Sequence, residues 1–264
     1  MELDLTGRVA VVTGASRGIG LAVTETLVAE GVHVVAGARR PGPELEALTR
    51  AGKAHSLAVD LGTAAGPGQL VELALTELGR VDILVNNVGA VTPRPNGFLL
   101  VTDEEWTRSI TLNLLSAIRA TRAVLPTMVT AGRGSIVTIA SINAYLPDPG
   151  VIDYSAAKAA LVNFTKSVSK EFGPRGVRAN AINPGPVATD LWLGAGGVAE
   201  TVAAGSGATP GAVADEAATH AVTGRFTQPA EVANLAAFLA ADRVAGNITG
   251  ATFTLDGGYT TETH

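Results

Sequence analysis

Tyr154 and Lys158 are the two side chains whose types and spacing suggest chemistry most directly. The chain holds 3 tyrosines and 4 lysines among 264 residues, so a Tyr-x-x-x-Lys arrangement arises by chance in about 5% of such chains. Both residues lie at the start of a helical pattern, and a spacing of four places them on one helix face. A cation held beside a phenol favours the phenolate form, so the pair is a candidate for proton transfer.

Two more polar residues are expected in the same neighbourhood. Ser141 precedes Tyr154 by thirteen residues and follows an apolar run that predicts a strand. Asn113 lies inside a long helical pattern, where asparagine is unfavourable and its placement needs a reason. Taken singly, each has an ordinary alternative: Ser141 as a turn residue, Asn113 as a buried group with backbone partners, and Tyr154 as half-buried core.

A glycine-rich turn near the N-terminus suggests phosphate binding. The segment Thr13-Gly14-Ala15-Ser16-Arg17-Gly18-Ile19-Gly20 follows the first predicted strand and runs into a helix. Glycines let the backbone approach a pyrophosphate, and a helix N-terminus directs its free N–H groups and positive dipole end toward it. A tight turn that needs positive φ is the alternative interpretation. Contacts with a dinucleotide are predicted for Gly14, Ser16, Arg17, Gly18, Ile19 and Gly20.

The end of the second predicted strand indicates which dinucleotide is bound. Ala38 and Arg39 stand where a carboxylate would bind the ribose hydroxyls of NAD. Guanidinium groups suit a 2′-phosphate, so Arg39, with Arg17 approaching from the glycine turn, predicts NADP(H) in preference to NAD(H). The alternative is that Arg39 and Arg40 are solvated loop charges. Further adenosine contacts are predicted at the next two strand ends, from Asp60 and Leu61 and from the run Asn86 to Gly89, with ordinary turn chemistry as the alternative for each.

Short apolar runs alternate with longer helical patterns along the chain, and these elements must position the polar residues. Helices are predicted at 19–30, 64–78, 103–130, 153–172 and 229–241, and strands at 9–13, 32–36, 54–59, 82–85, 135–140, 177–182 and 252–255. Strands that are apolar throughout and separated by helices predict βαβ units. The expected fold is α/β: a single-domain Rossmann fold with a doubly wound, mostly parallel seven-stranded sheet and helices on both faces.

No linker or repeat divides the pattern, so residues 1–264 are predicted to form one domain. Residues 188–223 are irregular and rich in alanine and glycine, with Pro210 and Gly211 as interior helix breakers, and they predict a mobile substrate lid. Trp192 and Leu193 in this lid are candidates to close over an apolar substrate, with ordinary packing as the alternative.

Composition excludes several classes of function. A net charge of −5 gives no basic surface for nucleic acid, and the absence of cysteine removes disulfides and thiolate chemistry. The 4 histidines are scattered without ligand spacing, so no metal site is expected. No apolar run reaches the ~18 residues of a membrane span, and the acidic start is unlike a signal peptide. A cytoplasmic protein is therefore expected.

Together, the motifs resemble the short-chain dehydrogenase/reductase family in its single-domain branch. The resemblance spans nearly the whole chain and includes the closing segment 250–258. Two departures are Val88, where the family usually has alanine, and a lid longer than in the smallest members. The residues that carry the resemblance are Thr13 to Gly20, Asp60, Asn86 to Gly89, Asn113, Ser141, Tyr154, Lys158 and Asn183-Pro184-Gly185.

The resemblance implies an enzyme that transfers a hydride between a nicotinamide and a carbonyl or secondary alcohol. Tyr154 would be the general acid and base, while Lys158 would favour its phenolate and hold the nicotinamide ribose. Ser141 would donate to the substrate oxygen, and Asn113 would hold a water that links Lys158 to solvent. Contacts with the nicotinamide or a phosphate are expected from Pro184, Gly185, Val187 and Thr189.

Two alternative functions keep the same scaffold. A reductase of acyl-carrier-bound 3-ketones would need a basic rim for its acidic carrier, and Arg133, Arg175 and Arg178 offer some positive charge. A non-catalytic dinucleotide sensor is the other, although it would not need the set of Ser141, Tyr154 and Lys158. Helices 103–130 and 153–172 are apolar around much of their circumference, which together with the resemblance predicts a homotetramer.

Overall fold

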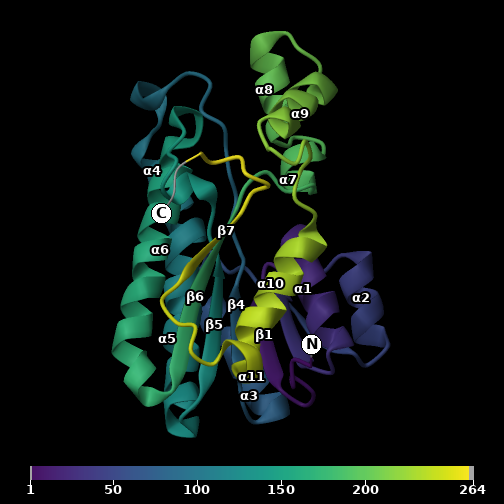
Figure 1. Ribbon diagram of the computed structural model, residues 1–264, viewed down its shortest axis with the longest axis vertical. Helices are drawn as coiled ribbons and strands as arrows, with labels where there is room; N and C mark the ends of the chain where they lie inside the picture. Colours follow the sequence, from purple (N-terminus) through teal and green to yellow (C-terminus); the bar gives the residue numbers. More distant parts are fainter. Residues whose placement is uncertain (1, 262–264) are drawn as a thin grey trace.

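Seven parallel strands form one sheet in the computed structural model, which describes residues 2–261 (Figure 1). Their order is β3-β2-β1-β4-β5-β6-β7. The order reverses between β1 and β4, and ligands of such sheets bind beside this reversal, outside the carboxyl ends of the strands. The strands are β1 (Val9–Thr13), β2 (His33–Ala38), β3 (Ala54–Ala58), β4 (Ile83–Asn86), β5 (Gly134–Ile139), β6 (Val177–Pro184) and β7 (Thr252–Leu255).

Helices cover both faces of the sheet, as predicted. One face carries α1 (Gly18–Ala29), α2 (Pro43–Arg50) and α10 (Pro229–Ala240), and the other carries α3 (Gly66–Leu78), α5 (Ser116–Ala131) and α6 (Ile152–Phe172) (Figure 1). Neighbouring residues of β1 show the alternation, because Val12 packs into the first core with Leu27 while Val11 packs into the second with Leu70. Burial on both faces explains why most of the inner strands are apolar without a polar alternation, whereas the edge strands β3 and β7 are partly exposed.

Two helical predictions differ from the structure. Helix α2 was not predicted because Pro41, Gly42 and Pro43 resemble a turn, yet proline is well tolerated in the first turn of a helix and Leu45 anchors α2 in the core. The predicted helix 103–130 is divided into α4 (Asp103–Ile110), a π-helical turn (Thr111–Leu115) and α5. Among residues 2–261, no helix is long and apolar enough to cross a membrane.

The lid segment, residues 188–223, stands above the carboxyl edge of the sheet (Figure 1). It holds three short helices, α7 (Asp190–Leu193), α8 (Val198–Ser206) and α9 (Pro210–Thr219). Pro210 does not break a helix here: it opens α9, whose Ala212 amide donates to the Thr209 side chain at 3.2 Å. The remaining short elements are α11 (Asp242–Ala245) and single 3₁₀ turns at Phe98–Leu100, Ile142–Ala144, Pro149–Val151 and Gly173–Arg175.

Candidate active site

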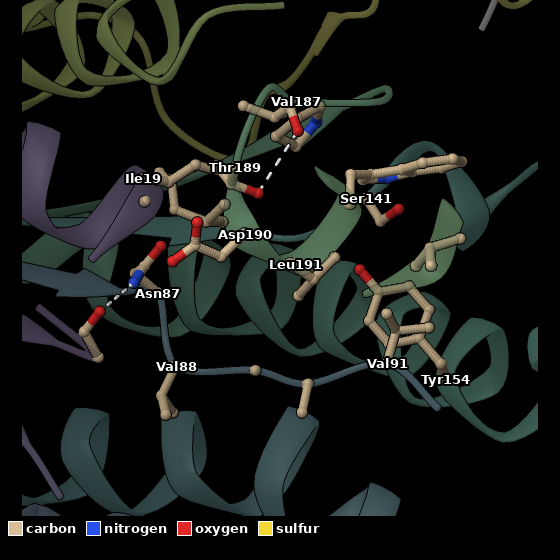
Figure 2. A pocket seen from close by; sticks show the side chains of 18 of the residues that line it. Ile19, Asn87, Val88, Val91, Ser141, Tyr154, Val187, Thr189, Asp190 and Leu191 are labelled. Atoms are coloured by element: carbon tan, nitrogen blue, oxygen red, sulfur yellow. Dashed lines mark hydrogen bonds between the residues drawn. The ribbon is translucent and has the colours of Figure 1, made fainter. Parts of the chain in front are cut away.

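A cavity of about 1540 Å³ opens at the carboxyl edge of the sheet and continues under the lid segment (Figure 2). It is lined by residues that follow β1, β2, β3, β4, β5 and β6, so the parallel topology gathers side chains that are far apart in the sequence. The structure brings most of the predicted site residues to this one cavity. The four that do not line it are Gly20, Asn86, Asn113 and the lid candidate Leu193.

The glycine turn is held in place by the segment that follows β4. Gly14 has a φ of +69°, and a Cβ atom there would lie 3.0 Å from the Cα of Val88. The side-chain amide of Asn87 donates to the carbonyl oxygens of Thr13 and Gly14, each at 3.0 Å. Gly20 lies behind the turn, where a Cβ would collide with the Gly14 carbonyl and the Asn87 amide. The turn therefore needs glycine for close packing as well as for its backbone angles.

Asn86 and Asn87 have different surroundings. Asn86 is buried, its amide donates to the Thr121 hydroxyl on α5 at 3.1 Å, and its side-chain oxygen has no partner among residues 2–261. Asn87 is the asparagine that lines the cavity. The sequence predicts contacts from the run Asn86 to Gly89, and within that run the structure places Asn87 at the cavity and Asn86 at the buried end of β4.

The adenosine end of the cavity presents exposed cations. Arg39 and Arg40 follow β2 and line the cavity, and neither forms an ion pair within residues 2–261. Arg17 lies 3.6 Å from the carboxylate of Asp190 in the lid segment. A guanidinium without a carboxylate partner, beside the buried Ala38, fits a 2′-phosphate better than a pair of ribose hydroxyls.

Asp60 and Leu61 line the same end of the cavity, just beyond β3. One oxygen of the Asp60 carboxylate accepts from the amide of Gly62 at 2.9 Å, which shapes the turn. At the other side of the cavity, the residues that follow β6 form its wall, namely Pro184, Gly185, Val187 and Thr189. A Cβ at Gly185 would lie 2.7 Å from the Cβ of Asp256, so this wall is closely packed from behind.

Tyr154, Lys158 and Ser141 converge in the middle of the cavity. The first two turns of α6 carry Tyr154 and Lys158, whose ammonium nitrogen lies 5.6 Å from the centre of the Tyr154 ring. Figure 2 shows the hydroxyls of Ser141 and Tyr154 directed into the same part of the cavity, near Leu191. The Ser141 hydroxyl also donates to Asn143 Oδ1 at 3.1 Å.

Burial sets the acid–base properties of this group. It raises the pKa of Tyr154, and a hydrogen bond with Ser141 acts in the opposite direction. Burial also lowers the pKa of Lys158 to about 8, and its ammonium donates to the carbonyl of Ile139 at 2.9 Å. A phenol that starts protonated is suited to give a proton to a developing alkoxide, and a lysine that titrates near neutral pH is suited to replace that proton.

Asn113 occupies the π-helical turn, which supplies the reason for its unfavourable place in a helix. Its side chain pairs with the backbone of Ala90, accepting from the amide at 3.0 Å and donating to the carbonyl at 2.9 Å. A Cβ at Gly89 would lie 2.9 Å from Asn113 Oδ1 and 3.5 Å from Lys158 Nζ. Asn113 thus lies just behind the cavity, and Gly89 leaves room for it to approach Lys158.

Several lining residues on the substrate side carried no signal in the sequence, because the lid segment and the chain end have no motif. Apolar side chains form much of this part, with Trp192 packed edge-to-face on Phe226 at 5.3 Å. Its charged members include Asp148, Asp190 and Glu216. Within residues 2–261, no group of three or more histidines or acids is arranged to hold a metal ion.

Comparison with known proteins agrees with this geometry. The family model described as short chain dehydrogenase matches residues 8–195. The 3-oxoacyl-[acyl-carrier-protein] reductase of Synechocystis sp. is 36% identical over 259 residues, covering 96% of this chain and 97% of that protein. The corresponding reductase FabG of Escherichia coli is 36% identical over 257 residues, covering 97% and 98%.

A solved structure extends the similarity to the whole fold. L-sorbose reductase from Gluconobacter frateurii, complexed with NADPH and L-sorbose, superimposes with a TM-score of 0.91 at 33% identity over 100% of both chains. The chain therefore belongs to the short-chain dehydrogenase family, the NAD(P)-dependent oxidoreductases of carbonyl and alcohol groups.

Proposed function

We propose that this protein is an NADP(H)-dependent reductase of a small-molecule ketone, and a dehydrogenase of the matching secondary alcohol. The observation that carries the proposal is the convergence of Ser141, Tyr154 and Lys158 in a cavity that continues to the glycine turn and Arg39. When bound, NADPH supplies the hydride, and the side chains of the protein supply alignment and the proton.

In carbonyl reduction, Tyr154 would donate its phenolic proton to the substrate oxygen as that oxygen gains negative charge. Ser141, which lies beside it, would donate a second hydrogen bond to the same oxygen and stabilise the developing charge. Lys158 would hold the ribose and return a proton to Tyr154. Because both side-chain groups of Asn113 already pair with Ala90, its main-chain carbonyl in the π-helical turn is the better candidate to hold the proposed water.

The substrate is proposed to be free in solution instead of attached to an acyl carrier. Similarity to the carrier-dependent reductases favours the carrier, but the expected basic rim does not support it. Arg133, Arg175 and Arg178 lie near the amino ends of β5 and β6, at the sheet edge opposite the cavity. Each has an acidic neighbour within 3.7 Å, and Arg178 is buried. An acidic carrier would instead meet Asp148 and Glu216 at the cavity.

Nicotinamide absorbance with a panel of ketones and alcohols tests this proposal. Uncharged ketones are expected to be reduced with NADPH, and Tyr154→Phe should lower kcat by roughly 10²- to 10⁴-fold while NADPH still binds. Matched ketones with and without a carboxylate test the charge argument, and the uncharged member should have the higher kcat/KM. Tight NADPH binding without turnover of any substrate would favour the sensor alternative, and a preference for a carrier-bound ketone would favour the carrier.

Self-association is a further part of the proposal. Helix α6 exposes small side chains at Ala156, Ala159 and Ala160, which leave an uncharged surface on which a second copy could pack closely. A homotetramer built partly on α5 and α6 is expected. Light scattering at micromolar concentration measures its mass, and a monomer would contradict this part of the proposal.

A further inference from the structure

Arg94 connects three segments around the start of the catalytic helix. It lies in the connection between β4 and α4, and its side chain is 9% exposed. Its guanidinium donates to both oxygens of Asp153, at 3.3 and 2.7 Å, and to Glu105 at 2.6 Å. Its backbone amide donates to the carbonyl of Gly150 at 2.7 Å. We call Arg94, Asp153 and Glu105 the Arg94 clamp.

Asp153 directly precedes Tyr154 in the first turn of α6. A carboxylate in the first turn of a helix is usually exposed, but the Asp153 side chain is only 3% exposed, because Arg94 reaches it from 59 positions earlier in the chain. Although burial acts to raise it, the hydrogen bonds from Arg94 hold the pKa of Asp153 below its usual value. The carboxylate therefore stays ionised and paired in the interior.

The first turn of α6 is tied to the preceding loop by Ser155, whose hydroxyl accepts from the Asp148 amide at 3.4 Å, but the helix lacks a side-chain cap. Its N-cap is Val151, which offers no side-chain hydrogen bond to the free amides. Helix ends without such partners fray readily, and here the fraying turn would carry Tyr154. The Arg94 clamp adds a charged restraint to this turn through Asp153.

The Arg94 clamp also lies close to the π-helical turn that carries Asn113. The Ser109 hydroxyl is close enough to Asp153 to help lower the pKa of that carboxyl. The amide of Asn113 in turn donates to the carbonyl and hydroxyl oxygens of Ser109, at 3.1 and 3.4 Å. Ser109 thus lies between the Arg94 clamp and the π-helical turn, near Asp153 on one side and bonded to Asn113 on the other.

We propose that Arg94 and Asp153 are positioning residues that hold the Tyr154 phenol in its reactive orientation relative to Ser141 and Asn113. The proposal rests on the proposed function, because it assigns Tyr154 its role. A buried ion pair is by itself weak evidence for stabilisation, since desolvation offsets much of the attraction. The position of this pair beside Tyr154 is better explained by a role in fixing the place of the phenol. A displacement of about 1 Å at a reacting group can lower the rate roughly 10²-fold.

Three variants test the clamp: Arg94→Met, Asp153→Asn and the double variant that carries both. Each is expected to lower kcat by roughly 10- to 100-fold, with the KM and Kd for NADPH changed less than about twofold. Arg94→Lys should recover part of the lost kcat, because one of the ion pairs can still form. The double variant removes both buried charges, so it should regain thermal stability relative to Arg94→Met without regaining kcat.

Arg178→Met is the matched control. Arg178 is as buried as Arg94, at 8%, and pairs with Asp242 at 2.9 Å, but it lies at the opposite edge of the sheet. This variant is expected to lose stability and keep the wild-type kcat at a temperature where it stays folded. Equal losses of kcat in both arginine variants, or recovery of kcat together with stability in the double variant, would overturn the proposal.

A second measurement does not depend on turnover. The chain has 3 tyrosines, so fluorine NMR of protein labelled with 3-fluorotyrosine gives a simple spectrum in which Tyr154→Phe identifies the Tyr154 resonance. That resonance should shift or broaden in Asp153→Asn and stay in place in Arg178→Met. An unchanged Tyr154 resonance in Asp153→Asn would overturn the proposed role of the clamp, even if no substrate were found. A shifted resonance in a protein that turns over no substrate would count against the proposed function alone.

Discussion

The two ends of the cavity are built in different ways. At the dinucleotide end, the backbone of the glycine turn packs against Val88, and the Asn87 amide is bonded to it. At the substrate end, short helices of the lid segment present side chains that remain largely open, such as Leu191 at 38% and Val202 at 42% exposure. The first end is closely packed and the second is loosely supported.

This difference matches the two proposed tasks of the cavity. One end would bind the same cofactor in every reaction, and the other would select the substrate. A backbone cradle needs particular residue types at fixed places, because a single added methyl group would collide with a carbonyl. A wall of side chains on short helices tolerates many residues and can be reshaped. We therefore expect substitutions at the dinucleotide end to affect folding and cofactor together, and substitutions in the lid segment to affect neither strongly.

Gly20→Ala should have the largest effect. The added Cβ would collide with the Gly14 carbonyl and the Asn87 amide, and neither can move without opening the turn. The free energy of unfolding should fall by about 3 kcal/mol and the Kd for NADPH should rise at least about tenfold. Denaturant titration and NADPH fluorescence measure the two losses. Gly68→Ala is the control, because a Cβ there in α3 meets no atom within 4 Å.

Lys158→Met should change how stability depends on pH. Below pH 8 the lysine is protonated in the folded and unfolded protein, so the full cost of its burial applies. Above that pH the folded protein loses the proton while the unfolded chain keeps it up to the usual pKa of 10.5, so wild-type stability rises.

The stability of wild type relative to Lys158→Met should therefore increase by about 2 kcal/mol between about pH 7 and pH 9.5. Urea titrations of the cofactor-free protein at several pH values measure this change. Lys166→Met is the control, because Lys166 lies on the same helix and donates to the Gly250 carbonyl at 2.8 Å from an exposed position. A change of the same size in both variants would contradict the argument from burial.

Arg39→Ala should act on one cofactor. Loss of a charge-assisted hydrogen bond to a 2′-phosphate should raise the Kd for NADPH about tenfold and leave that for NADH nearly unchanged. Isothermal titration with both cofactors makes the comparison. Arg40→Ala tests whether the neighbouring cation shares the role, and equal weakening of both cofactors by Arg39→Ala would exclude a 2′-phosphate contact.

The same contrast explains which features the sequence alone could predict. The strands were placed within about two residues, because burial on both faces makes most of the inner strands short apolar runs with clear ends, although the edge strands β3 and β7 are partly exposed. The glycine turn, Ser141, Tyr154 and Lys158 were found because the backbone or the chemistry restricts their residue types. Their gathering at one edge then follows from the parallel topology.

Features that depend on distant partners were not predictable in this way. Asp153 resembles a surface residue until Arg94 is placed against it, and nothing local distinguishes Asn86 from Asn87. The π-helical turn leaves the apolar pattern of helix 103–130 almost unchanged, so only the unfavourable Asn113 marked it. Pro210 follows the capping Thr209, a local signal that was present but was interpreted as a break.

Gly205→Ala should have the smallest effect and the opposite sign. Gly205 is exposed within α8, and a Cβ there meets nothing within 4 Å. Alanine should stabilise α8 by about 0.5–1 kcal/mol, because it lowers the conformational entropy of the unfolded chain. The gain should appear as slower hydrogen exchange in α8, with the Kd for NADPH unchanged.

Gly207→Ala is the matched control, two positions further along. It also has open space around its Cβ, but its φ is +73° as the residue that ends α8. Alanine is strained in that conformation, so exchange in α8 should become faster by an amount that corresponds to about 1 kcal/mol. Both glycines have open space around the added Cβ. Slower exchange in Gly205→Ala and faster exchange in Gly207→Ala would therefore show that backbone conformation, and not packing, determines which side chains α8 tolerates. A loss at both would mean that α8 is packed as tightly as the glycine turn, and the contrast between the two ends of the cavity would fail.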